Sequence, residues 1–170
     1  MTLTTHAVAG ATVAELFPSH PVLAFSAGFI SHLAIDFLPH WDYKILSLQE
    51  DKKNPLNTDM ILGKYFLLDL TRIGFDAFLG LILSLFIFGY FFNKSLAIAL
   101  IGAVGAFLPD ALQFVYWKSR SKFLLPLQRF HIWVQEGKSL HIHPLLGLSL
   151  QLILIVILNF TIFVITKGFA

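Results

Sequence analysis

Long apolar runs separated by short polar segments dominate the hydrophobic pattern of this chain. Four runs hold close to the roughly 20 residues that a helix needs to cross a hydrocarbon core of about 30 Å. They are residues 21–38, 65–92, 96–116 and 145–165. A shorter apolar stretch, residues 4–17, cannot cross alone, so we expect a half-length helix that forms a hairpin with the first span. The pattern predicts an all-α, polytopic membrane helical bundle in which residues 1–170 form one domain.

The composition supports a membrane-embedded chain and narrows the possible chemistry. Of the 170 residues, 56% are hydrophobic and 13% are charged, and this charged fraction is about half that of an average soluble domain. The formal net charge of +2 is too small for a nucleic-acid-binding surface. The chain has no cysteine, which excludes thiolate metal sites and cysteine nucleophiles. Any metal centre must therefore use histidine and carboxylate ligands.

Basic residues are concentrated in two of the predicted loops. Residues 40–64 hold four lysines and residues 117–139 hold five basic residues, whereas the opposite side of the predicted topology carries only Lys94 and Lys167. Because lysine and arginine are enriched in loops that remain in the cytoplasm, both loops are expected to face inward. The sequence thus predicts an integral protein of a bacterial or archaeal cytoplasmic (inner) membrane, in contact with membrane lipids.

Ionisable residues at the cytoplasmic ends of the predicted spans indicate a functional site, because charged groups within spans are costly. His32 and Asp36 are four residues apart and share one helix face. Pro39 is expected to stop that helix, so that His40 folds back toward the same point. Imidazole and carboxylate ligands suit a divalent transition metal, with zinc or manganese expected here. The simpler alternative is that His32 and Asp36 only hydrogen-bond each other inside the bundle.

Other segments bring further candidate ligands to the same depth. His6 points inward if the N-terminal helix is antiparallel to the first span, and Asp110 follows Pro109 in the third span. His141 and His143 precede the fourth span. Alternatively, Asp110 ends its helix and the two loop histidines are ordinary interfacial residues. The expected metal ligands are His6, His32, Asp36, His40, Asp110, His141 and His143.

A charged stripe lies in the second predicted span. Asp69, Arg72 and Asp76 occur at i, i+3 and i+7, which places them on one face of a helix. Two interpretations remain open: a buried ion-pair network, or an anion-binding Arg72 that Asp76 orients. His131 lies among aromatic residues and is interpreted as an interfacial residue, and His20 lies at the opposite membrane face. The catalytic candidates are Asp110, Arg72 and Asp76.

Three short motifs carry a resemblance to a known family. Thr5-His6 is similar to a Thr-His or Gly-His pair near the start of the family's members. Residues 38–42 and 108–110 resemble parts of a G-x-x-x-P-D-x-D-H motif, and residues 140–146 resemble the end of an H-R-G-x-T-H-S-L-L motif. The family is that of inner-membrane-associated metal-dependent hydrolases described as regulated by or binding the LexA repressor. The resemblance implies a metal-dependent hydrolytic site but names no substrate.

The chain departs from these family motifs at three positions. Leu112 and Gln113 stand where the family has its second Asp and its His, and Lys138 stands where the late motif has its first His.

We expect a metal-dependent hydrolase at the cytoplasmic interface, acting on phosphoesters of lipids or other amphiphiles with a metal-activated water. The alternatives are a non-catalytic membrane interaction module, whose polar cluster specifies packing, and an ion or metal transport subunit.

Overall fold

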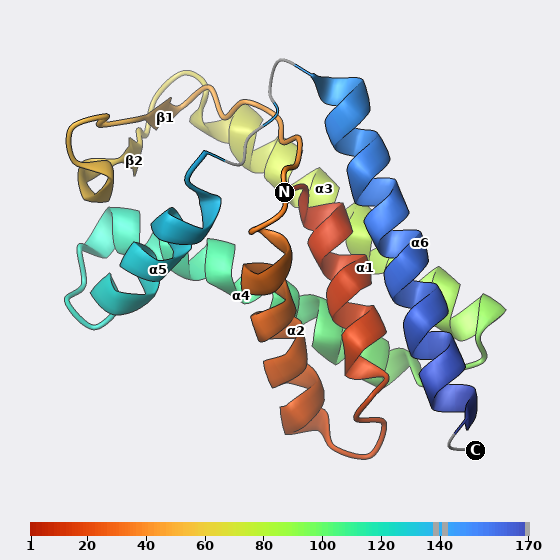
Figure 1. The fold of residues 1–170 in the computed structure, drawn as a ribbon. Helices are drawn as coiled ribbons and strands as arrows, with labels where there is room; N and C mark the ends of the chain where they lie inside the picture. Colours follow the sequence, from red (N-terminus) through yellow and green to blue (C-terminus); the bar gives the residue numbers. More distant parts are fainter. Residues whose placement is uncertain (138–139, 141–142, 169–170) are drawn as a thin grey trace.

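Helices account for most of the computed structural model, which describes residues 1–137, 140 and 143–168. Within these residues the all-α expectation is confirmed, and two strands of two residues each form a small antiparallel hairpin. The α-helices are α1 (Leu3–Ala14), α2 (Pro21–Ile35), α3 (Phe66–Phe86), α4 (Leu96–Ser119), α5 (Leu125–Gln135) and α6 (Pro144–Gly168) (Figure 1). The strands are β1 (Leu48–Gln49) and β2 (Asp59–Met60), with the 3-10 turn η1 (Pro55–Asn57) between them, and the π-helical turn η2 (Ile87–Phe91) extends α3.

Three of the described helices are long and apolar enough to cross a membrane: Phe66–Phe91, Leu96–Ser119 and Pro144–Thr166. The fourth expected span, residues 21–38, is shorter than predicted, because α2 ends at Ile35 after 15 residues. At 1.5 Å per residue α2 is about 22 Å long, less than a hydrocarbon core of about 30 Å. Pro39 explains the early end, since a proline disfavours helical geometry in the residue before it. The chain is thus a helical membrane protein.

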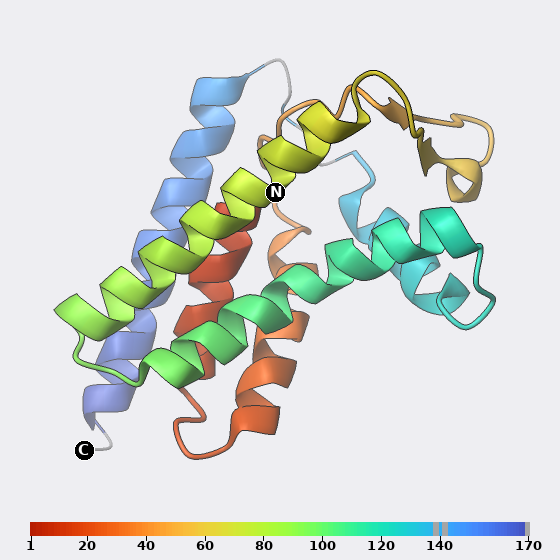
Figure 2. The same ribbon diagram turned by 180° about the vertical axis from the view of Figure 1, so that it is seen from behind.

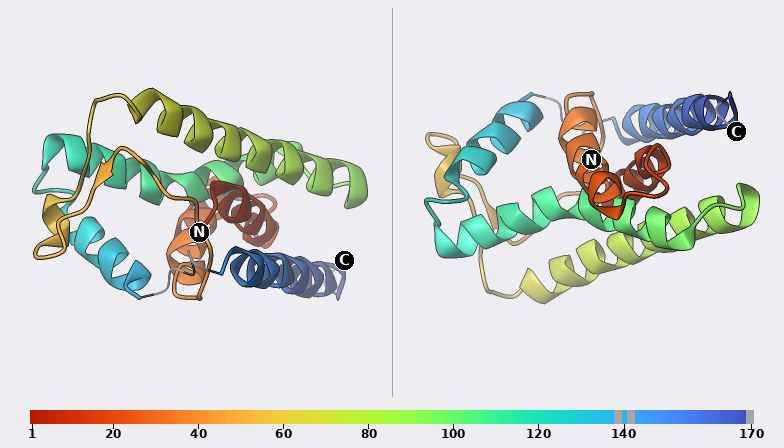
Figure 3. Two further views of the ribbon diagram at one scale, coloured as in Figure 1. Left: turned by 90° about the horizontal axis from the view of Figure 1, so that it is seen from above. Right: turned by 90° about the horizontal axis from the view of Figure 1, so that it is seen from below.

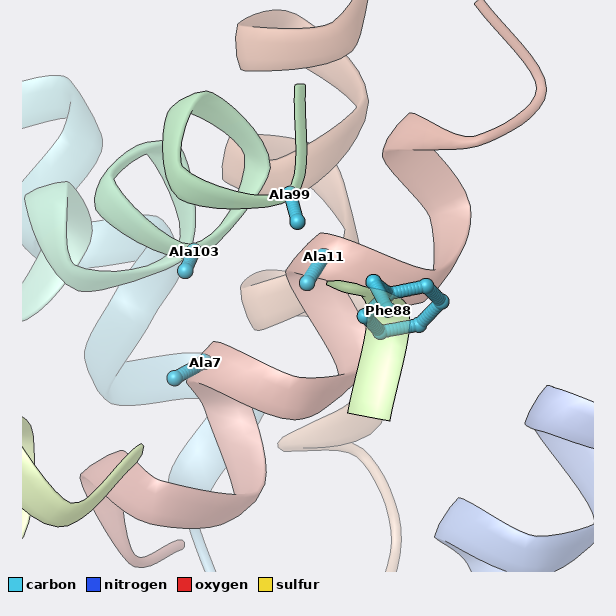
Figure 4. Packing of buried hydrophobic residues seen from close by; sticks show 5 residues of the cluster. All are labelled: Ala7, Ala11, Phe88, Ala99 and Ala103. Atoms are coloured by element: carbon cyan, nitrogen blue, oxygen red, sulfur yellow. The ribbon is translucent and has the colours of Figure 1, made fainter. Parts of the chain in front are cut away.

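Helix α1 lies at the centre of the bundle, where ten of its twelve residues are buried. Its neighbours are α2, α3, α4 and α6, as views from opposite sides and from above show (Figures 1, 2 and 3). Small side chains permit this packing: Ala7 and Ala11 face Ala99 and Ala103 of α4, with the ring of Phe88 beside them (Figure 4). The expected hairpin is confirmed, because α1 and α2 run antiparallel (Figure 1).

Glycines set the distance between α4 and its two central neighbours. A Cβ atom on Gly28 of α2 would collide with the carbonyl oxygen of Gly102, and a Cβ atom on Gly10 of α1 would meet the same carbonyl. Gly105 meets the Phe25 carbonyl in the same way. Gly102 and Gly105 therefore mark close helix contacts, and backbone-to-backbone approach of this kind is typical of membrane helices.

The C-terminal half of α4 extends beyond α1 and α2 and carries two structures that the sequence did not predict. The β1–β2 hairpin packs there through Met60, which lies in one apolar cluster with Tyr116 and Trp117. The Lys118 ammonium lies 2.7 Å from the Asp59 carboxylate and ties the hairpin to α4. Helix α5, which falls in a segment expected to be a loop, runs back beside α4 (Figure 2). Its buried residues, Gln128, His131 and Val134, lie on one face of the helix.

Candidate metal centre

Three histidines and two aspartates from four helices converge at one point of the bundle. His6 comes from α1, His32 from α2, Asp36 from the C-cap of α2, Asp110 from α4 and His131 from α5. The side chain of Asp110 is 31% exposed. Those of the other four residues are at most 1% exposed. Two overlapping groups are spaced to hold an ion: His6 with His32 and Asp110, and His32 with Asp36 and His131.

The orientation of the His32 ring is fixed by a backbone carbonyl. Its Nδ1 atom lies 2.7 Å from the carbonyl oxygen of Ala106. A carbonyl can only accept, so Nδ1 carries the hydrogen and donates it. Nε2 then points into the cluster, 3.4 Å from Asp36 Oδ2 and 3.5 Å from Asp110 Oδ1. Metal-binding histidines commonly show this arrangement, in which the second ring nitrogen is held by a carbonyl or a carboxylate.

His131 completes the polar cluster from the opposite side. Its Nε2 atom lies 3.2 Å from His32 Nε2, 3.4 Å from Asp36 Oδ2 and 3.6 Å from Asp110 Oδ1. Ligand atoms bound tetrahedrally at 2.0–2.1 Å are separated from one another by about 3.3–3.4 Å. The separations in the cluster are close to this value, so the nitrogens and oxygens are placed as the ligands of one small cation would be.

His6 is buried, and its Nδ1 has no hydrogen-bond partner. Its ring stacks on that of His32 with centroids 3.7 Å apart, and its Nε2 lies 3.2 Å from Asp36 Oδ1. Nδ1 of His131 is also buried and unpartnered. Buried polar atoms without partners are rare in proteins, because each costs free energy. A cation in the cluster would give a buried ring nitrogen a further partner.

Asp36 is held in place from several directions. The side-chain amide of Gln135 donates to its Oδ2 at 2.9 Å, and the amide nitrogen also lies 3.0 Å from His131 Nε2. The Met1 nitrogen lies 3.3 Å from its Oδ1. Because donors surround both oxygens, Asp36 is fixed as an acceptor. Gln135 therefore links two candidate ligands, although no role was expected for it.

The structure supports four of the seven expected ligands as members of the cluster: His6, His32, Asp36 and Asp110. His40 is buried, but its Nδ1 bonds the Leu38 carbonyl, and it belongs to neither candidate group among the described residues. His143 is exposed at the start of α6, and His141 lies outside the described residues.

The interpretation of His131 as an interfacial residue without a role in the site is wrong. His131 is 1% exposed and contributes a nitrogen to the cluster. A sequence signal existed: Gln128, His131 and Gln135 follow the spacing of one helix face, which is the spacing expected of a polar inner face. The alternative in which Asp110 ends its helix is also wrong. Pro109 and Asp110 lie inside α4, which continues to Ser119.

The charged stripe in α3 divides into two separate structures. Asp69 is buried and accepts from the backbone N–H and hydroxyl of Ser47, at 2.6 and 2.7 Å. Arg72 is 47% exposed and lies 3.7 Å from Asp69. Asp76 accepts from the backbone N–H groups of Leu3 and Thr4, at 2.7 and 3.1 Å. The interpretation in which Asp76 orients Arg72 is therefore corrected: Asp76 binds the N-terminus of α1.

The loop after α2 carries two groups whose titration is shifted. Burial raises the pKa of Asp42 to about 6, against the opposing effect of the Met1 amino group, 3.6 Å from its Oδ2. Burial, together with the same amino group, lowers the pKa of His40. Both effects disfavour charge, and they are consistent with a poorly solvated segment next to the cluster.

The fold and the cluster together define a helical membrane protein with a candidate metal centre at one end of its central helix. No protein-family model, no curated protein and no solved structure matches the chain.

Proposed function

We propose that this chain is a membrane-embedded, metal-dependent hydrolase that holds one divalent transition ion, zinc or manganese. The observation that carries the proposal is the convergence of three imidazoles and two carboxylates, with the His32 ring oriented by the Ala106 carbonyl. The ion is single because both ligand groups share His32. Because His32 Nδ1 bonds the Ala106 carbonyl, only Nε2 has a lone pair that can bind an ion.

The proposed ligands differ in how well they are reached from outside. His6, His32, Asp36 and His131 are enclosed, whereas Asp110 is partly exposed. A bound transition ion supplies a water whose pKa is lowered to about 7. Asp110 is the most exposed of these side chains, so water and substrate would reach the ion from its side, where its carboxylate would accept a proton. The enclosed residues would hold and orient the ion, and Asp110 is the candidate for the proton transfer.

The proposed setting is the cytoplasmic interface of a bacterial or archaeal inner membrane, and the proposed substrates are phosphoesters of lipids or amphiphiles. The cluster lies where α1 begins and α2 ends, with the basic loop segments 40–64 and 117–139 next to it along the chain. A site at this depth meets headgroups rather than acyl chains. The excess of basic residues in these loops favours the cytoplasmic side.

Metal content and hydrolysis measured on the same preparations test the proposal. Wild-type protein reconstituted with zinc or manganese should hold about one equivalent per chain and release it to a chelator. It should also hydrolyse bis(p-nitrophenyl) phosphate or a fluorogenic lipid phosphoester. His32→Ala should lose both properties, whereas His20→Ala, at the far end of α2, should keep both. Wild-type protein without metal would refute the proposal.

A second function is favoured by the contacts of Asp36. Its oxygens already have Gln135 and the Met1 nitrogen as partners, so the cluster could serve packing alone in a non-catalytic membrane interaction module. That function predicts that His32→Ala lowers the melting temperature while no variant binds metal. The two functions therefore give opposite metal contents for the wild type.

A further inference from the structure

Helix α5 has two faces with opposite surroundings. Its inner face carries Gln128, His131 and Val134, all buried, and Gln135, which bonds Asp36. Its outer face carries Phe130 and Trp133, both exposed. With 11 residues α5 is about 16 Å long, too short to cross a hydrocarbon core of about 30 Å. It is an amphipathic helix at the edge of the bundle (Figures 1 and 3).

The outer face of α5 continues onto the segment that follows α2. The ring of Phe37 meets that of Trp133 edge-on at 5.2 Å, and Phe130 lies 5.6 Å from Trp133. Leu38 is exposed beside Phe37. We call these four residues the aromatic face. Large exposed apolar surfaces on proteins mark sites where another apolar phase or partner binds.

Three observations identify what covers the aromatic face. The face continues onto α2, whose exposed Val22 and Ile30 are part of the apolar exterior of a membrane bundle. Tryptophan is characteristic of the boundary between headgroups and acyl chains. Arg129 is exposed next to Phe130 in the same helix, a pairing of cation and aromatic ring typical of helices on anionic membrane surfaces.

We propose that α5 is an interfacial helix whose aromatic face lies in the headgroup and acyl boundary of an anionic bilayer. Such helices bury their apolar face about 5–10 Å into that boundary. The same helix presents His131 and Gln135 to Asp36, so lipid contact on one face positions the cluster on the other. This consequence rests on the proposed metal site, whereas the lipid contact does not.

The absence of native cysteine makes a depth measurement direct. Single cysteines at positions 130, 133, 136 and 156 are labelled with an environment-sensitive fluorophore, and the full chain is reconstituted in vesicles containing phosphatidylglycerol. Quenching by nitroxide lipids, placed near the headgroup or deep in the acyl chain, is compared with quenching by aqueous iodide. Glu136 and Val156 are the controls: Glu136 is an exposed charged residue at the end of α5, and Val156 is an exposed residue within α6.

Labels at 130 and 133 should be quenched by the shallow nitroxide more than by the deep one, and should be shielded from iodide. The label at 136 should respond to iodide, and the label at 156 to the deep nitroxide. Iodide quenching at 130 and 133 would overturn the proposal, because the face would then meet water. Protection from all three quenchers would also overturn it, since another protein surface would cover the face.

A metal assay on the same vesicles separates the two proposals. Replacing Phe130 and Trp133 together by serine should weaken metal retention, whereas Trp133→Tyr, which keeps an interfacial aromatic ring, should leave it unchanged. If the wild type binds no metal, the quenching pattern still decides where α5 lies. If metal is bound but iodide reaches positions 130 and 133, only the interfacial helix is refuted.

Discussion

Replacement of Asp76 by alanine tests how the central helix is anchored. The carboxylate accepts the Leu3 N–H at 2.7 Å, the Thr4 N–H at 3.1 Å and the Thr4 hydroxyl at 2.6 Å. Hydrogen bonds to charged groups contribute about 1.5–3 kcal/mol each. An anion at a helix N-terminus adds about 0.3–1 kcal/mol. Because Asp76 is half-buried and water can replace part of these contacts, we expect a net loss of about 2–3 kcal/mol.

For a chain of this size about 2–4 °C of melting temperature corresponds to 1 kcal/mol, so Asp76→Ala should melt about 4–12 °C below wild type. Thermal unfolding in detergent, followed by circular dichroism, measures this shift. Arg72→Ala is the matched control on the same helix, and its exposed pair with Asp69 contributes at most about 1 kcal/mol. Equal melting of both variants at the wild-type temperature would refute the anchoring role. Loss of metal without loss of stability would place Asp76 in the site instead.

Three further predictions concern the cluster and the loop beside it. His131→Ala should abolish metal retention measured by mass spectrometry, whereas His143→Ala should leave it intact; the reverse result would exclude the cluster. Metal affinity in equilibrium dialysis should fall as the pH drops through the ordinary histidine range near about 6.5, because bound imidazoles must be neutral. Asp42 has a raised pKa of about 6, so its contribution to stability is lost as the pH rises through that value. Asp42→Asn should therefore melt at the wild-type temperature below about pH 4 and at a higher temperature than wild type at neutral pH. The opposite order would contradict the partial burial of Asp42.

The hydrophobic pattern predicted the helices but not the segments that surround the end of α4. Residues 65–92, 96–116 and 145–165 were recognisable as helices because their apolar runs are long and nearly continuous. Helix α5 was missed because Gln128, Arg129 and Gln135 give its segment a loop-like composition. Its helical form depends on burial against α4 and α2, which is a tertiary effect that propensity does not contain.

The candidate site was predictable where helical periodicity or the expected order of the spans places a residue, as for His32, Asp36, His6 and Asp110. His32 and Asp36 share a helix face at i, i+4, so their proximity follows from helical periodicity alone. His131 reaches the same atoms across 99 residues of chain, and no periodicity specifies that contact. His40 failed for a related reason: its position depended on where α2 ends, and helix ends are the least certain feature of a sequence pattern.

The register between α2 and α4 explains why the ligands meet. Gly28 and Gly102 are in contact where neither helix has a side chain. One turn later on both helices, His32 donates to the Ala106 carbonyl, and a further turn brings Asp36 and Asp110 within 3.5 Å of His32 Nε2. Only glycine allows the first contact, and only the first contact brings a backbone carbonyl close enough to orient an imidazole. Helix packing and ligand orientation in this protein are therefore set by the same pair of glycines.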